Sequence, residues 1–129
     1  MIVETVRLSE KARNQLIQIK RKTKVEQWNV ICRWALLLSL KEENPPPIEN
    51  LKTDSPIEMA WKTFAGELSA PIVGMVRAKY VDARVEYSDI EIEEFFKLHL
   101  HRGVSFLANA TKDNISSLLS LTKNAEKSS

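Results

Sequence analysis

The spacing of apolar residues changes from the period of a strand to the period of a helix within the first part of the chain. Residues 2–8 alternate in polarity and are rich in β-branched side chains, which is typical of a short strand or an extended arm. Ser9 then has the properties of a helix N-cap, and the spacing of apolar residues behind it predicts a helix over roughly residues 10–22. After a short break, the pattern predicts a second helix over roughly residues 25–40.

The second predicted helix is apolar on nearly every side. A helix of this kind must be covered on more than one face. In a chain of 129 residues, contacts between subunits are a natural source of the additional cover, so we expect an oligomer. The residues expected in the subunit interface are Trp28, Ile31, Trp34, Ala35 and Leu38.

The middle of the chain contains a proline-rich segment and two further helix starts. Residues 41–54 include Pro45, Pro46 and Pro47 and are interpreted as an extended surface linker. Residues 55–58 read Ser-Pro-Ile-Glu, which predicts a helix that begins with a capping box. Another helix is expected from Pro71 to about residue 83.

A second capping box at residues 88–91 predicts a last long helix, in which Gly103 is expected to mark an end or a kink. With only 3 Gly and 5 Pro, the chain has few residues for the tight turns of an all-β fold. We therefore expect a mainly α protein with a compact multi-helix single domain, an N-terminal strand and a ribbon-helix-helix-like start. Residues 1–110 are expected to form the helical DNA-binding and oligomerisation domain, and residues 111–129 a partly disordered C-terminal extension.

Cysteine usage and apolar runs indicate a cytoplasmic location. The single Cys32 cannot form an internal disulfide, which suits a reducing compartment. Residues 1–8 lack the features of a signal peptide, and the longest apolar run, residues 34–38, is too short to span a membrane. No membrane association is expected.

Charge is distributed unevenly along the chain. Residues 1–41 carry nine Lys or Arg against three acids, a net charge of +6. Residues 42–98 have a net charge of −6, and residues 99–129 restore the total to +2. Such an asymmetry indicates a basic binding face on an otherwise neutral body, although a chance distribution of solvated faces would also produce it.

The end of the first predicted helix carries the densest group of cations. This group, the basic cluster, consists of Lys20, Arg21, Lys22 and Lys24. Cations at a helix C-terminus favour the negative pole of the helix dipole, but stability alone seldom requires so many mutually repelling charges. With Lys11, Arg13 and Arg7 as assisting residues, the cluster could neutralise several phosphates of double-stranded DNA. No aromatic residue interleaves with it, so stacking on single strands is not indicated.

The sequence contains no recognisable catalytic, metal or cofactor site. His99 and His101 stand two positions apart on a predicted helix, so their side chains point to different faces and cannot chelate one ion. Cys32 lies in the most apolar helix and is expected to behave as a small hydrophobe. Glycine-rich phosphate-binding loops are absent. We expect no cofactor and no enzymatic activity.

Two families resemble this chain. Over residues 3–40 the order of strand, capped helix and apolar helix resembles the ribbon-helix-helix repressors, in which a two-stranded ribbon enters the major groove. That resemblance implies a transcriptional regulator that reads bases through Val3, Thr5 and Arg7.

A closer resemblance, to the DndE family of bacterial DNA phosphorothioation systems, covers about residues 7–107. The resemblance rests on four short sequence motifs that occur in the order found in the family. They are Arg7-Leu8-Ser9, Asn29-Val30-Ile31-Cys32-Arg33, Phe64-Ala65-Gly66-Glu67 and His99-Leu100-His101-Arg102-Gly103-Val104.

The DndE resemblance implies a compact helical protein that assembles as a tetramer and binds duplex DNA, with a preference for nicked duplex. It also implies partners that supply sulfur transfer and ATPase activity. The family's DNA contact is attributed to lysines on a basic surface, which correspond here to the cluster at Lys20–Lys24. A scaffold that binds only proteins is a further alternative. A nicking nuclease would require a metal site that the sequence does not contain.

Overall fold

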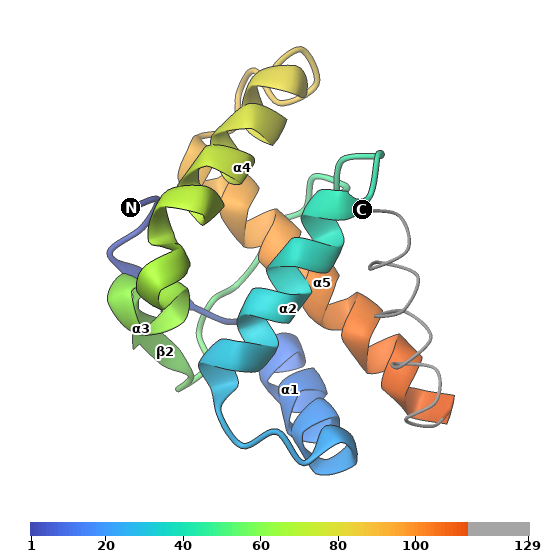
Figure 1. The fold of residues 1–129 in the computed structure, drawn as a ribbon. Helices are drawn as coiled ribbons and strands as arrows, with labels where there is room; N and C mark the ends of the chain where they lie inside the picture. Colours follow the sequence, from blue (N-terminus) through green and yellow to red (C-terminus); the bar gives the residue numbers. More distant parts are fainter. Residues whose placement is uncertain (114–129) are drawn as a thin grey trace.

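The structure, a computed structural model, describes residues 1–113, and over these residues the chain is mainly helical with one small sheet (Figure 1). The elements in chain order are β1 (Thr5–Arg7), α1 (Glu10–Thr23), α2 (Trp28–Lys41), β2 (Glu58–Ala60), α3 (Trp61–Ala65), the 3₁₀ helix η1 (Gly66–Leu68), α4 (Ser69–Asp82) and α5 (Ile92–Asp113). The predicted fold class is confirmed, including the strand at the N-terminus.

Helix α1 begins where the sequence predicts. The Ser9 hydroxyl accepts a hydrogen bond from the Ala12 N–H at 3.1 Å, which satisfies one of the free amides of the first turn. Its apolar stripe of Ala12, Leu16 and Ile19 is buried, and the helix packs mainly against α5. A residue far along the sequence also fixes the start of α1, because the Ser9 N–H donates a hydrogen bond to His101 Nε2 at 3.0 Å.

Helix α5 crosses the molecule diagonally and makes its largest contact with α2 (Figure 1). Gly103 lies in the middle of α5, so the helix end predicted as one possibility at this position is wrong. The glycine serves close packing instead: a Cβ atom added here would lie 1.8 Å from the Ala35 carbonyl oxygen. The absence of a side chain lets the backbones of α2 and α5 touch.

Residues 55–60 do not begin a helix, and the helix predicted from the capping box is wrong at its start. The Ser55 hydroxyl instead accepts from the N–H of Ile57, two residues on, and the chain then extends. Residues 58–60 form β2, which pairs antiparallel with β1 in the register Thr5↔Ala60. Non-local strand pairing therefore overrides the local helix signal, and the helix begins only at Trp61.

The proline-rich segment is only in part the predicted surface linker. Pro46 is buried, and its carbonyl oxygen accepts a hydrogen bond from the Tyr87 hydroxyl. Tyr87 in turn contacts Phe95 of α5 edge to face, with 5.1 Å between ring centroids. Pro46 therefore anchors the segment to the turn between α4 and α5.

Helix α5 extends to Asp113, three residues past the expected boundary at residue 110, and the division into domain and extension stays a prediction. From residue 114 onward the predicted extension lies outside the described residues. Within residues 1–113, no helix has both the length and the apolar character that crossing a bilayer requires.

Candidate nucleic-acid interface

The basic cluster lies at the turn that joins α1 to α2. Lys20, Arg21 and Lys22 occupy the last turn of α1, where cations face the negative pole of the helix dipole. Lys24 caps the helix with a left-handed backbone, φ 64°, and its N–H donates to the Lys20 carbonyl at 2.9 Å. Three of these side chains, Arg21, Lys22 and Lys24, are exposed.

The three exposed cations form no ion pair with a carboxylate of residues 1–113. A helix end and a tight turn fix their backbone positions and hold the three charges close to one another. This arrangement is suited to contact with a polyanion such as a phosphate backbone.

Lys20 has a different environment from the rest of the cluster. Its ammonium nitrogen lies 4.6 Å from the centroid of the Trp28 ring, a cation–π contact that joins the end of α1 to the start of α2. Its side chain is only partly exposed. Lys20 therefore contributes to the shape of the turn as well as to its charge.

Of the three predicted assisting residues, two form ion pairs with carboxylates and one, Lys11, forms none within residues 1–113. Arg7 forms an ion pair with Glu58 across the small sheet, and Arg13 forms one with Glu10 at 2.9 Å on α1. Lys11 is exposed in the first turn of α1, at the other end of the helix from the cluster. Exposed ion pairs contribute at most about 1 kcal/mol, so a phosphate could replace either carboxylate at little cost.

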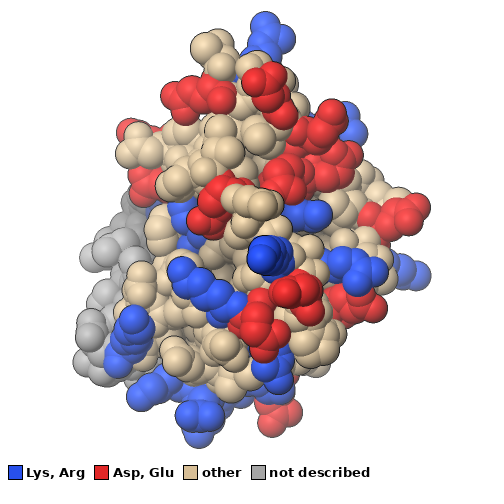
Figure 2. All heavy atoms as spheres, turned by 180° about the vertical axis from the view of Figure 1, so that it is seen from behind, with Lys and Arg blue, Asp and Glu red and all other residues tan. Residues whose placement is uncertain are grey.

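Basic and acidic side chains are distributed unevenly over the face shown in Figure 2. On the face shown in Figure 2, Lys and Arg predominate at the lower end, and most of the Asp and Glu lie in the upper half. Figure 1 places the α1–α2 turn at that lower end and the C-terminal end of α4 at the top. On this face, the charge asymmetry of the sequence therefore appears as an excess of basic side chains near the α1–α2 turn.

The residues predicted for the subunit interface do not share one environment. Ile31 and Ala35 are fully buried inside the single chain and belong to its core. Trp28 and Leu38 are half-buried, and Trp34 is 39% exposed. Only these last three of the predicted residues present apolar surface outward.

Two exposed apolar residues that the sequence analysis did not single out add to this surface. Leu37 is 37% and Met75 39% exposed. They line, together with Leu40, a shallow and mainly apolar hollow between α2 and α4. Exposure of large side chains on neighbouring helices is typical of a contact surface.

The histidines, which sequence reasoning set aside, lie in two separate hydrogen-bond networks. His101 is neutral with its proton on Nδ1, because Nε2 accepts from the Ser9 N–H and Nδ1 donates to the Lys97 carbonyl at 2.8 Å. Burial lowers the pKa of His101 below its usual value. Among residues 1–113, no three His, Cys, Asp or Glu side chains converge as a metal site would require.

His99 contacts Ser39 of α2, with Nδ1 2.8 Å from the hydroxyl oxygen. The same hydroxyl oxygen accepts from Arg102 Nε at 2.9 Å, and Arg102 also donates to the Ser39 carbonyl at 2.8 Å. Burial, followed by the charges of Arg102 and Lys79, lowers the pKa of His99 to about 4. This network fastens α5 to the end of α2. In the sequence, the one indication of this hydrogen-bond network is the motif at residues 99–104.

Cys32 is fully buried, as the apolar pattern predicts, and burial raises the pKa of its thiol to about 12. It packs as a core residue and has no thiolate character at neutral pH.

Comparison with known proteins identifies one family and one fold. The family described as DNA sulphur modification protein DndE matches residues 5–115. The structure is similar to DndE from Escherichia coli B7A, involved in DNA phosphorothioation modification, with a TM-score of 0.67 and 19% identity over 83% of this chain and 98% of that one. It is also similar to a DndE variant with two glycine-to-lysine substitutions, with a TM-score of 0.60 and 18% identity over 82% of this chain and 99% of that one. No curated protein sequence matches the chain.

Proposed function

The chain belongs to the DndE family of DNA sulphur modification proteins, and we propose that within a phosphorothioation system it acts as the subunit that binds the DNA backbone. The observation that carries this proposal is the group of exposed cations at the α1–α2 turn, Arg21, Lys22 and Lys24, which form no ion pair within residues 1–113. No catalytic role is proposed for this chain, and sulfur insertion is assigned to partner proteins with sulfur-transfer and ATPase activity.

Phosphate contact, rather than base readout, is the mode of binding that this surface favours. Each phosphate neutralised by a cation releases counterions, so the logarithm of the affinity falls with the logarithm of salt concentration by about 0.9 per contact. Side chains at a helix end and turn reach backbone oxygens readily, and such contacts carry no sequence information. We therefore expect steep salt dependence and little sequence preference.

Oligomerisation is part of the proposal. The apolar surface of Trp34, Leu37 and Met75 gives two copies a place to associate. A homotetramer is favoured, because it would present several basic clusters to one duplex and multiply their affinity. A preference for nicked duplex would follow, since a nick lets the duplex bend toward several clusters at low deformation energy.

The ribbon-helix-helix alternative is less well supported by the geometry. Strand β1 pairs with β2 of the same chain, Val3 and Thr5 are partly buried, and Arg7 forms an ion pair with Glu58. The side chains expected to read bases therefore have partners within the small sheet or lie partly covered against it.

The test measures fluorescence anisotropy of intact and nicked duplexes of one sequence, and of an unrelated duplex, over a salt series. In the variant Arg21→Glu with Lys22→Glu, we expect affinity to fall by at least about tenfold and the salt slope to decrease by about two contacts per subunit. The control variant, Arg77→Glu with Arg84→Glu, reverses two exposed charges on and just after α4. It should retain most of the affinity.

Equal loss in both variants would mean that net charge, and not the cluster, sets the affinity. Tight binding to one sequence alone would favour a repressor, and no binding at low salt would leave a scaffold whose basic cluster docks onto protein.

A further inference from the structure

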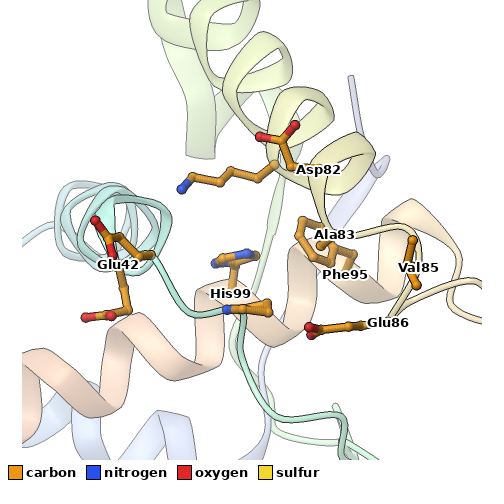
Figure 3. Close-up of a pocket in the computed structure, with 10 residues that line it drawn as sticks. Glu42, Asp82, Ala83, Val85, Glu86, Phe95 and His99 are labelled. Atoms are coloured by element: carbon orange, nitrogen blue, oxygen red, sulfur yellow. The ribbon is translucent and has the colours of Figure 1, made fainter.

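A cavity at the end of the molecule remote from the basic cluster combines groups that DNA binding does not use. It has a volume of about 260 Å³ and lies between the C-terminal ends of α2 and α4 and the first turns of α5 (Figure 3). This space, the His99 cavity, is lined by Glu42, Glu43, Pro45, Lys79, Asp82, Ala83, Val85, Glu86, Phe95 and His99. Its size lies just below the roughly 300–1,000 Å³ of pockets for drug-sized ligands, so it suits a smaller molecule.

The buried part of the cavity contains a hydrogen-bond donor without an acceptor. His99 is 1% exposed, and its Nε2 has no hydrogen-bond partner in residues 1–113. The Ser39 hydroxyl oxygen accepts from Arg102 Nε, so its own hydrogen can point to Nδ1 of His99, 2.8 Å away. On this pattern of hydrogen bonds we assign the imidazole proton to Nε2.

An N–H buried without an acceptor costs about 1–3 kcal/mol. A ligand atom that accepts this hydrogen bond would recover that free energy. Lys79, which is half-buried in the same wall, forms no ion pair with any carboxylate of residues 1–113. An N–H donor and an unpaired ammonium group on one wall favour an anionic acceptor, such as a carboxylate.

The outer part of the cavity favours a positively charged ligand group instead of an anionic one. Glu42, Glu43, Asp82 and Glu86 are all exposed and surround the opening. Figure 3 shows His99 between Glu42 on one side and Asp82 and Glu86 on the other. These four carboxylates make the rim negatively charged, which favours a cation near the opening. Phe95, Val85 and Pro45 add apolar surface between the two charged regions.

We propose that the His99 cavity binds a small zwitterion of the α-amino-acid class, with its carboxylate on His99 Nε2–H and Lys79 and its ammonium group among the rim carboxylates. A metal ion is not the expected ligand, because a protonated Nε2 has no lone pair to donate. The site stands apart from the proposed DNA contact, which lies at the other end of the molecule, so either assignment can fail without the other.

The experiment uses the full chain and three matched probes in an NMR titration that observes the His99 ring nitrogens. L-Leucine carries both charges, isoamylamine lacks the carboxylate and isocaproate lacks the ammonium group. We expect leucine to shift the Nε2 resonance and to bind at least about tenfold more tightly than either of the other two. Saturation with leucine should also raise the measured pKa of His99, because a carboxylate against the imidazole favours its protonated form.

Two variants locate the site without disturbing the buried network. Lys79→Met should weaken leucine binding by about tenfold, whereas Lys62→Met, which removes an exposed lysine on α3, should leave it unchanged. Isoamylamine binding as tightly as leucine would reduce the site to an acidic surface and overturn the proposal. Isocaproate binding as tightly as leucine, or no shift of Nε2 with any probe, would overturn it as well.

Discussion

Gly103 of α5 and Ala35 of α2 are in backbone-to-backbone contact, and a Cβ atom at position 103 would lie 1.8 Å from the Ala35 carbonyl oxygen. Gly103→Ala must therefore push apart the two helices that form the main contact of the core. We expect a loss of at least about 3 kcal/mol in the free energy of unfolding, the upper end of the range for overpacking. Urea denaturation followed by circular dichroism measures it.

Gly74 provides the matched control for this substitution. It also lies within a helix, α4, but a Cβ atom there would meet nothing within 4 Å. Gly74→Ala should stabilise the protein by about 0.5–1 kcal/mol through helix propensity alone. Destabilisation of similar size in both variants would contradict the close-contact explanation for Gly103.

Lys24→Gly should change stability and DNA affinity in opposite directions. Lys24 has a left-handed backbone, φ 64°, which glycine adopts without strain, so thermal unfolding should show a gain of about 0.5–1 kcal/mol. The same change removes one exposed cation and should weaken duplex binding at low salt. Lys24→Ala removes the charge but keeps the strain, so it should weaken binding without the gain in stability. If Lys24→Gly bound DNA like the wild type, Lys24 would not contact phosphate.

Stability should fall as the pH is lowered below neutrality. The pKa of His99 is about 4 in the folded protein and about 6.5 when unfolded, so the unfolded chain binds the proton more readily. The contribution of neutral His99 is complete above pH 6.5 and is lost as the pH falls toward 4, about 3 kcal/mol in all. Denaturant midpoints measured across this pH range test the prediction. His99→Gln should reduce the pH dependence and leave the part due to His101, whose pKa is also lowered by burial. An unchanged profile in that variant would exclude His99 as a source.

The oligomer should depend on the apolar surface between α2 and α4. Leu37→Glu places a charge on a side chain that is 37% exposed, and we expect light scattering after size-exclusion chromatography to show a smaller assembly. Val85→Glu alters an apolar residue that is 88% exposed, in the turn after α4, and should leave the assembly intact. An unchanged mass for the Leu37 variant would place the interface elsewhere.

Sequence reasoning was reliable where the signal was local. The Ser9 cap, the stripe of Ala12, Leu16 and Ile19, and the cations at the end of α1 all follow from neighbours within a few positions. Helix propensity and capping chemistry determine such features without the rest of the fold.

The features that the sequence did not predict depend on partners far along the chain. β2 forms where a capping box predicted a helix, because its hydrogen-bond partner is β1. The role of Gly103 is visible only when α2 lies across α5, and the contact between Ser39 and His99 joins residues 60 positions apart. The His99 cavity was missed for the same reason, since its walls come from three separate segments.

The hydrogen bond from Ser9 to His101 spans 92 positions and has a consequence for synthesis on the ribosome. The basic helix α1 leaves the exit tunnel well before α5, yet its N-terminal anchor, His101, lies in the middle of α5. Contacts between residues so distant in sequence form late and slow folding. In a nascent chain, helix α1 therefore remains undocked, with its apolar stripe available to chaperones, until the middle of α5 has been made.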